Sequence, residues 1–224
     1  PLMFGGKDNW QNYDMFITIL ATINKDLCND VFALDAEWTE SDVVKAFDYY
    51  QRLFTDGIVQ DGALSTTIYN EGYSQWKDDD GNSSIPMIFN GSWDLGSLKA
   101  ENSFYENFSS NDIRVATMPS IEGKEGAVLK APDVAWGINA ASPNQQAAWE
   151  FVKWLCYDMQ QSVEYGLGFF SVLKEAPSPA VALTDDYKAA YDTISAAAAS
   201  DNTVGFRSSF YTKVNDELFD QLQL

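Results

Sequence analysis

The chain is 224 residues long and strongly acidic, with 14 lysines and arginines against 33 aspartates and glutamates and a formal net charge of −19. This charge repels phosphate backbones and anionic membranes, which argues against a nucleic-acid-binding protein. The absence of histidine removes the commonest general base and the commonest metal ligand. The two cysteines, Cys28 and Cys156, lie far apart and outside any C-x-x-C pattern, so neither a metal nor a cofactor is expected.

The size and apolar content of the chain fit a globular protein with a substantial core. About 220 residues can form one large domain or two small ones. No run of about 18 consecutive apolar residues occurs, so no membrane-spanning segment is expected. The 7 tryptophans, 11 tyrosines and 14 phenylalanines suit stacking on carbohydrate, and they equally suit an ordinary large core.

Hydrophobic spacing predicts two amphipathic helices near the start of the chain. Residues 10–27 carry apolar side chains at intervals of three and four, as a helix with one buried face does: Tyr13, Phe16, Ile17, Leu20 and Ile23. A second helix is expected to begin near Ser41, with Asp42 in its first turn, and to end at Gly57. Its inward side chains are expected to be Val44, Phe47, Tyr50 and Phe54. A short helix over residues 72–76 should lead into a solvated loop, whose aspartates lack the spacing of an EF-hand calcium site.

Residues 85–95, with the sequence IPMIFNGSWDL, predict a buried strand followed by a tight turn. The apolar residues 85–89 suit a strand that is buried on both faces. Asn90 and Gly91 end it, because both residue types tolerate a sharp exit. Trp93 then stands at the mouth of the turn, where its indole could stack on a sugar ring while Asn90 and Ser92 hydrogen-bond its hydroxyls. The alternative is that Trp93 only fills a core.

The second half of the chain is expected to alternate short strands and helices. A strand over residues 113–118 and a turn over 119–126 precede a crossing over 130–140. A helix should then begin with Ser142 as its cap and Pro143 in its first turn, and run to about residue 157. Its buried side chains are expected to be Trp149 or Ala148, Val152, Leu155 and Cys156. Because Cys156 lies on that apolar face, we expect two free, mostly buried thiols, although a disulfide is the alternative. A shorter helix to about 165, a return crossing over 166–170 and helices over 184–200 and 207–222 complete the chain.

Several of these motifs together resemble a known family. The order NGSW at residues 90–93, MPS at 118–120, GINAASPN at 137–144 and WEFVKWL at 149–155 is similar to that in the extracellular sugar-binding proteins of bacterial ABC transporters, the family of maltose-binding protein. The opening residues 1–20, the segment 166–179 and the closing residues 208–222 resemble the same family. The resemblance therefore spans nearly the whole chain.

The resemblance implies an α/β, periplasmic-binding-protein-like fold of type II, with a mostly helical C-terminal lobe that holds a small sheet. Residues 1–127 would form the first part of that lobe, residues 128–168 the hinge crossing and a short strand-helix return piece of the N-terminal lobe, and residues 169–224 the closing helices. Family members are usually nearly twice as long, so we expect a fragment that lacks most of the N-terminal lobe. Weak or no sugar affinity is then expected for this chain alone.

The resemblance also implies a set of ligand-binding residues. Framework positions of the family correspond here to Trp93, Trp136, Trp10, Tyr13, Phe210 and Tyr211. Asn90, Ser92, Asp94 and Asp133 could hydrogen-bond sugar hydroxyls. Each position has a plainer interpretation as packing, capping or surface structure. The last helix lacks the tryptophan that maltose-binding protein has there, which puts a long malto-oligosaccharide in doubt.

The implied function is capture rather than catalysis. A sugar or oligosaccharide would bind in a cleft between two lobes and be delivered to the ABC permease subunits in the membrane. The expected location is extracellular, as a cell-surface lipoprotein or a periplasmic protein, and this follows from the family alone. The alternatives are a glycoside hydrolase that uses two carboxylates, or a carbohydrate-binding surface protein without a role in transport.

Overall fold

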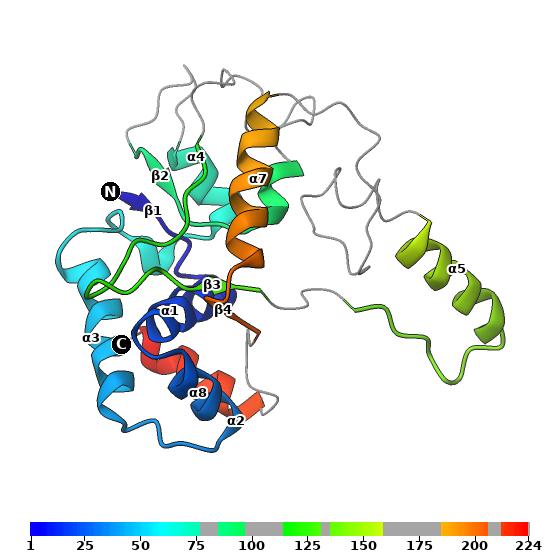
Figure 1. Ribbon diagram of the computed structural model, residues 1–224, viewed down its shortest axis with the longest axis horizontal. Coiled ribbons are helices and arrows are strands. Elements are labelled where there is room, and N and C mark those ends of the chain that lie inside the picture. Colours follow the sequence, from blue (N-terminus) through cyan, green and yellow to red (C-terminus); the bar gives the residue numbers. More distant parts are fainter. Residues whose placement is uncertain (77–84, 97–113, 131–134, 159–184, 206–211, 224) are drawn as a thin grey trace. The chain divides into compact units, whose positions relative to one another are not determined.

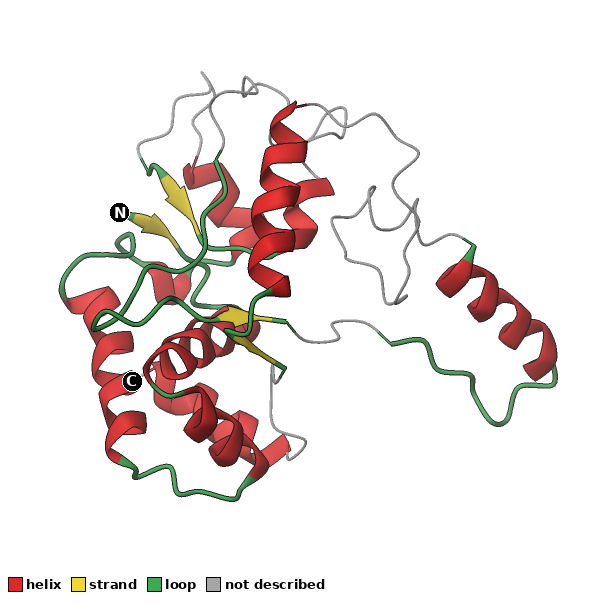
Figure 2. Ribbon diagram, viewed as in Figure 1, coloured by secondary structure: helices red, strands yellow, loops and turns green. Residues whose placement is uncertain are grey.

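A computed structural model of the protein describes residues 1–76, 85–96, 114–130, 135–158, 185–205 and 212–223 (Figure 1). The chain divides into two compact units. The first comprises Pro1–Asn90, Ala116–Ala131 and Ile194–Leu224, and the second comprises Gly91–Val115 and Pro132–Thr193. Most of the described secondary structure is helical, and the strands are short (Figure 2).

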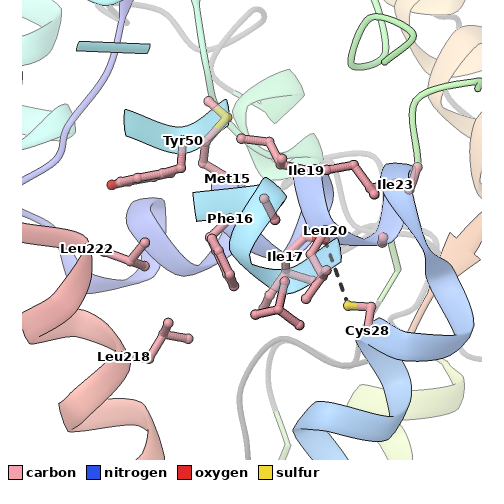
Figure 3. Close-up of a cluster of buried hydrophobic side chains, with 14 of the residues drawn as sticks. Met15, Phe16, Ile17, Ile19, Leu20, Ile23, Cys28, Tyr50, Leu218 and Leu222 are labelled. Atoms are coloured by element: carbon pink, nitrogen blue, oxygen red, sulfur yellow. Dashed lines mark hydrogen bonds between the residues drawn. The ribbon is translucent and has the colours of Figure 1, made fainter. Parts of the chain in front are cut away.

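The first unit is organised around α1, Asn9–Ile23, which is buried along almost its whole length. The helices α2 (Lys25–Ala33), α3 (Ser41–Thr55) and α8 (Thr212–Gln223) pack against it. Figure 3 shows side chains of α1 together with Cys28 of α2, Tyr50 of α3 and Leu218 and Leu222 of α8 in one hydrophobic cluster. This cluster anchors α1 from Met15 onward in the core of the first unit.

Two details of these helices differ from the sequence-based expectation. The helix expected over residues 10–27 is two helices, because Asn24 adopts an extended conformation that ends α1, and its side chain caps α2 by accepting from the Leu27 N–H at 3.1 Å. In α3 the buried valine is Val43, whereas Val44 is 50% exposed. Tyr50 is buried as expected.

Two short parallel sheets belong to the first unit. Strand β1, Leu2–Met3, pairs with β2, Met87–Ile88, and a single bridge joins Leu2 to Val59 on the other side. Strand β3, Val128–Leu129, pairs with β4, Thr203–Val204. The expectation of a strand buried on both faces over residues 85–89 is wrong, since β2 has only two residues and Met87 is 55% exposed. The described part of the strand expected at 113–118 has no regular structure.

A compact segment after α3 packs against the loop that joins β1 to α1. It contains the 3₁₀ turn η1, Ala63–Ser65, the π-helical turn η2, Ile68–Gly72, and the short helix α4, Tyr73–Trp76. Residues 72–76 are helical as expected, and α4 follows the π-helical turn η2 directly. A Cβ atom at Gly5 would lie 2.6 Å from the Ile68 nitrogen, and one at Gly6 would lie 3.0 Å from the Ala63 carbonyl oxygen. The two glycines thus allow this segment to approach closely.

The second unit contains the 3₁₀ turn η3, Ser92–Gly96, and the helix α5, Gln145–Tyr157. The boundary between the units falls within α7, Asp185–Ala199. Helix α5 begins later than expected, with Asn144 as its N-cap, and the Ser142 hydroxyl accepts from the Asn144 N–H at 3.2 Å.

The expected buried stripe of α5 is wrong for the residues that the structure describes. None of the residues of this helix is buried, and Trp149 and Trp154 are 49% and 42% exposed. Both cysteines are free thiols; Cys28 is buried, whereas Cys156 is only half-buried. Within the described residues no helix is long and apolar enough to cross a membrane. The loop at 77–84, the short helix to 165 and the return crossing at 166–170 lie outside the described residues.

Candidate carbohydrate-binding site

Three aromatic rings meet at the start of α1 in the first unit. Trp10 stacks on Tyr69 with ring centroids 6.1 Å apart and planes 23° apart. Tyr69 contacts Tyr73 edge-on at 5.7 Å. Tyr69 is 49% exposed, and Trp10 and Tyr73 are half-buried. We refer to Trp10, Tyr69 and Tyr73 as the aromatic cluster, which presents apolar ring surface at the edge of the first unit's core.

The cluster is held by contacts between the loop before α1 and the segment at residues 63–73. Asp8 occupies the N-cap position of α1, but its side chain does not cap that helix. Its Oδ2 instead accepts from the Ile68 N–H at 2.7 Å, directly before Tyr69. Backbone bonds from Gly6 to Ala63 and from Lys7 to Thr66, at 2.9 and 3.1 Å, run alongside. These bonds place Tyr69 against Trp10.

The next turn of this segment is tied down by Glu71. Its carboxylate accepts from the backbone N–H of Thr67 at 3.1 Å and from the Thr67 hydroxyl. The hydrogen bond from the Thr67 side chain is the largest cause of a lowered pKa for Glu71. The Thr67 hydroxyl, followed by the backbone N–H groups of this turn, therefore favours the charged form of the carboxylate.

Asn90 adds an amide to the cluster from the end of β2. Its Nδ2 donates to the Tyr73 hydroxyl at 2.9 Å. The preceding residue, Phe89, is bonded on both sides, because its N–H donates to the Met3 carbonyl at 3.0 Å and its carbonyl accepts from the Gln11 side chain at 2.8 Å. Of the residues predicted from sequence, Trp10 and Asn90 are therefore linked through Tyr69 and Tyr73.

Ser92, Trp93 and Asp94 lie in η3 of the second unit. The Trp93 ring rests on the backbone of Gly91, since a Cβ atom there would lie 2.3 Å from the ring. The Asp94 N–H donates to the Gly91 carbonyl at 3.1 Å. All three side chains are half-buried. Gly91 thus leaves room for the Trp93 ring, whereas its φ is not in the left-handed region that would favour glycine in the turn itself.

The remaining predicted site residues are placed differently. Tyr13 packs edge-on against Phe219 of α8 at 6.3 Å, and burial, followed by the charges of Asp216 and Asp220, raises the pKa of its hydroxyl. Trp136 is 58% exposed in the second unit, and a Cβ atom at the following Gly137 would meet open space, so no close backbone approach explains that glycine. The predicted residues Phe210, Tyr211 and Asp133 lie outside the described part of the chain.

Tyr69 and Tyr73 are the residues that sequence reasoning missed. They are spaced i, i+4, as neighbours on one helical face are, and this spacing was a usable signal. Their contact with Trp10 joins positions about sixty residues apart, which no local pattern reveals.

A cavity among the described residues lies at the opposite end of α1. It has a volume of about 430 Å³ and is lined by residues 21–26 with Lys124, Glu125 and Asn202. The Lys25 and Lys124 amines both donate to backbone carbonyls there, those of Asp201 and Ile23. Both lysine amines are therefore used to hold neighbouring segments of the chain together around this cavity.

The chemistry of the aromatic cluster suits recognition of a neutral, ring-shaped solute. Aromatic faces bind the C–H faces of such rings, and an amide such as that of Asn90 can both donate and accept hydrogen bonds. Within the described ranges no three acidic, cysteine or histidine side chains are grouped to hold a metal ion. The two carboxylates next to the cluster, Asp8 and Glu71, are both bonded to backbone N–H groups.

Comparison with known proteins decides the family. The model of the family described as bacterial extracellular solute-binding protein matches residues 1–161. The chain belongs to this family. A solved structure described as a chitin oligosaccharide binding protein superposes on the solute-binding chain with a TM-score of 0.74 at 19% sequence identity. No curated protein matches it.

The structural match covers 100% of this chain and 58% of the chitin oligosaccharide binding protein. The solute-binding chain thus spans 58% of the length of that protein. The match confirms the α/β, periplasmic-binding-protein-like fold expected from the sequence. The family match places the chain among solute-binding proteins.

Proposed function

We propose that this chain belongs to the carbohydrate-binding component of an ABC transporter, which captures a sugar or oligosaccharide and delivers it to the permease subunits in the membrane. The observation that carries the proposal is the aromatic cluster with Asn90 at its edge. A stacked indole and phenol with an adjacent amide provide both the apolar and the polar contacts that a pyranose ring needs.

The solute class is supported by two features that are independent of each other. The site offers aromatic faces and an amide, which are the groups that bind neutral rings, and the carboxylates of Asp8 and Glu71 beside it already accept backbone hydrogen bonds. The fold is shared with a protein whose name says that it binds chitin oligosaccharides. An N-acetylglucosamine oligomer is therefore the first ligand to test, followed by other oligosaccharides of similar length.

The proposal has further parts that follow from membership of the family. Trp10 and Asn90 remain candidate ligand-binding residues of the whole protein, as do Ser92, Trp93, Asp94 and Trp136. Capture would occur in a cleft between two lobes, on the extracellular side of the membrane, in a cell-surface lipoprotein or a periplasmic protein. The sugar would leave chemically unchanged.

The test is a titration of the chain with chitohexaose, maltohexaose and cellohexaose, followed by the tryptophan indole N–H signals in NMR spectra. We expect weak binding of at least one oligosaccharide, with a shift of the Trp10 signal. Trp10→Ala and Tyr69→Ala should weaken binding about tenfold, which corresponds to about 1.4 kcal/mol.

Tyr49→Ala is the matched control. Tyr49 is a half-buried tyrosine of α3 that bonds to Glu122 and lies outside the aromatic cluster. Its replacement should leave the affinity unchanged. Binding of no oligosaccharide, or equal losses in all three variants, would contradict the proposal. Release of shorter sugars would point to a hydrolase instead.

A further inference from the structure

The buried side chain of Gln11 joins two strands where their main-chain pairing stops. Gln11 is 0% exposed and follows Trp10 in the first turn of α1. Its Oε1 accepts from the Gly5 N–H at 2.8 Å, and its Nε2 donates to the Phe89 carbonyl at 2.8 Å. Gly5 continues β1 and Phe89 continues β2, so one side-chain amide bridges the ends of both strands.

Gln11 bonds the Gly5 N–H and the Phe89 carbonyl, and these two groups would bond to each other if the parallel ladder of β1 and β2 continued. In a parallel ladder a residue bonds to the two residues that flank its partner. The Phe89 N–H donates to Met3, which is the first of these bonds. The second would run from the Gly5 N–H to the Phe89 carbonyl, and the Gln11 amide lies between those groups instead. The Gln11 side chain therefore replaces one main-chain hydrogen bond of the ladder, and it separates the two strands between Gly5 and Phe89.

The side chain of Gln60 likewise replaces a main-chain hydrogen bond on the other side of β1, where Leu2 pairs with Val59. The Gln60 N–H donates to the Leu2 carbonyl at 3.1 Å, which continues the pairing of the Leu2–Val59 bridge. The next bond would join the Phe4 N–H to the Gln60 carbonyl. The Phe4 N–H donates to the Gln60 side-chain oxygen at 2.9 Å instead, and Gln60 Nε2 donates to the Phe4 carbonyl at 2.8 Å.

The position of these bridges connects them to the binding site. Open α/β sheets bind their ligands outside the carboxyl ends of parallel strands. Gln11 acts at that end of β1 and β2, next to Trp10 in sequence and bonded to the residue before Asn90. Gln60 acts at the same end, but both of its side-chain bonds go to Phe4 and neither goes to the segment that carries Asn90.

We infer that Gln11 is a positioning residue of the binding site, whose amide sets the separation between Trp10 and Asn90 by opening the sheet at its carboxyl edge. This inference rests on the proposed function for its consequence in ligand binding. Gln11 does not touch the ligand in this scheme. It acts through Phe89 and Gly5 on the residues that do.

The experiment compares Gln11→Met with Gln60→Met. Both variants lose a buried side-chain amide with two hydrogen bonds and keep the length of the side chain, so both should lose stability. Only Gln11→Met should move Asn90. We expect it to shift the NMR signal of the Asn90 side-chain amide and to weaken binding of chitohexaose, or of the oligosaccharide that binds best in the titration above, about tenfold. Gln60→Met should do neither.

Two further measurements separate the possible failures. If the wild-type chain binds no oligosaccharide, the proposed function fails while the Asn90 amide signal still tests the positioning role. If Gln11→Met does not fold, Gln11→Asn keeps a buried amide but is one methylene shorter, so it cannot reach both Gly5 and Phe89, and it should shift the same signal. An unchanged Asn90 signal in the folded Gln11 variant, or equal shifts and equal affinity losses in the Gln11 and Gln60 variants, would overturn the inference.

Discussion

The close approach of Gly5 to Ile68 gives a sharp test of the structure. In Gly5→Ala the new methyl group would lie 2.6 Å from the Ile68 nitrogen and 2.8 Å from its Cβ, where real Cβ contacts stay above 3.0 Å. The nearest of these atoms belongs to the backbone, so the segment itself must move. Overpacking of this kind costs typically about 1–3 kcal/mol. The shift also strains the bond from Ile68 to Asp8 that places Tyr69.

We expect Gly5→Ala to destabilise the protein by about 2 kcal/mol, which lowers the melting temperature of a chain of this size by roughly 4–8 °C. Differential scanning calorimetry measures this change. Gly137→Ala is the matched control, because a Cβ atom at Gly137 would meet open space. If Gly5→Ala melts within a degree or so of Gly137→Ala, the close approach of the segment at residue 68 to this loop is incorrect.

Three other changes probe the site, the core and the packing of α8. Tyr73→Phe removes the oxygen that accepts from Asn90 and should cost about 1 kcal/mol in urea unfolding, whereas no loss would mean that this bond does not form in solution. Burial raises the pKa of Cys28 to about 12, so only Cys156 should react with a thiol reagent in the native protein at pH 8. Because that pKa is higher in the folded than in the unfolded chain, Cys28 lowers stability as pH rises above 9 toward 12, and Cys28→Ala should flatten this part of the pH profile. Leu222→Ala empties a buried site on α8 and should cost about 2–5 kcal/mol by the same urea assay; a smaller loss would show that α8 is loosely packed.

The helices of the first unit were largely predictable from hydrophobic spacing, because each buries one face against the others. The sequence did not reveal that the pattern over residues 10–27 belongs to two helices. The break depends on the extended conformation of Asn24, which a continuous apolar stripe does not record. The burial of Val43 in place of the expected Val44 has a similar cause. Adjacent β-branched residues offer two possible phases for the buried face of α3, and packing against α1 selects one.

Burial was the property that sequence predicted least well. The spacing in α5 describes a face that could be buried, but burial also requires a covering element, and Trp149 and Phe151 are about half exposed. The apolar run at 85–89 likewise suggested a strand enclosed on both faces. In the structure β2 pairs with β1 alone among the described strands, and Met87 is left exposed.

The candidate site was predicted in part. Trp10 and Asn90 followed from motifs and from the resemblance to a family, and the structure links them through Tyr69 and Tyr73. The contact between Trp10 and Tyr69 depends on the glycines before α1 and on the unusual bond from Asp8 to a distant backbone N–H. Such long-range contacts are set by tertiary packing, and local periodicity carries no information about them.

At the end of β1, glutamine side chains take the place of main-chain hydrogen bonds between strands, and this has an evolutionary consequence. A main-chain hydrogen bond is available with every residue type except proline, so point mutation seldom removes one. Gln11 and Gln60 are side chains, and a single codon change can shorten, lengthen or delete either bridge. The width of this end of the sheet can therefore change through a few substitutions while the helical core stays intact. Proteins with this fold can therefore change the spacing at this end of the sheet to suit new solutes without a change of fold.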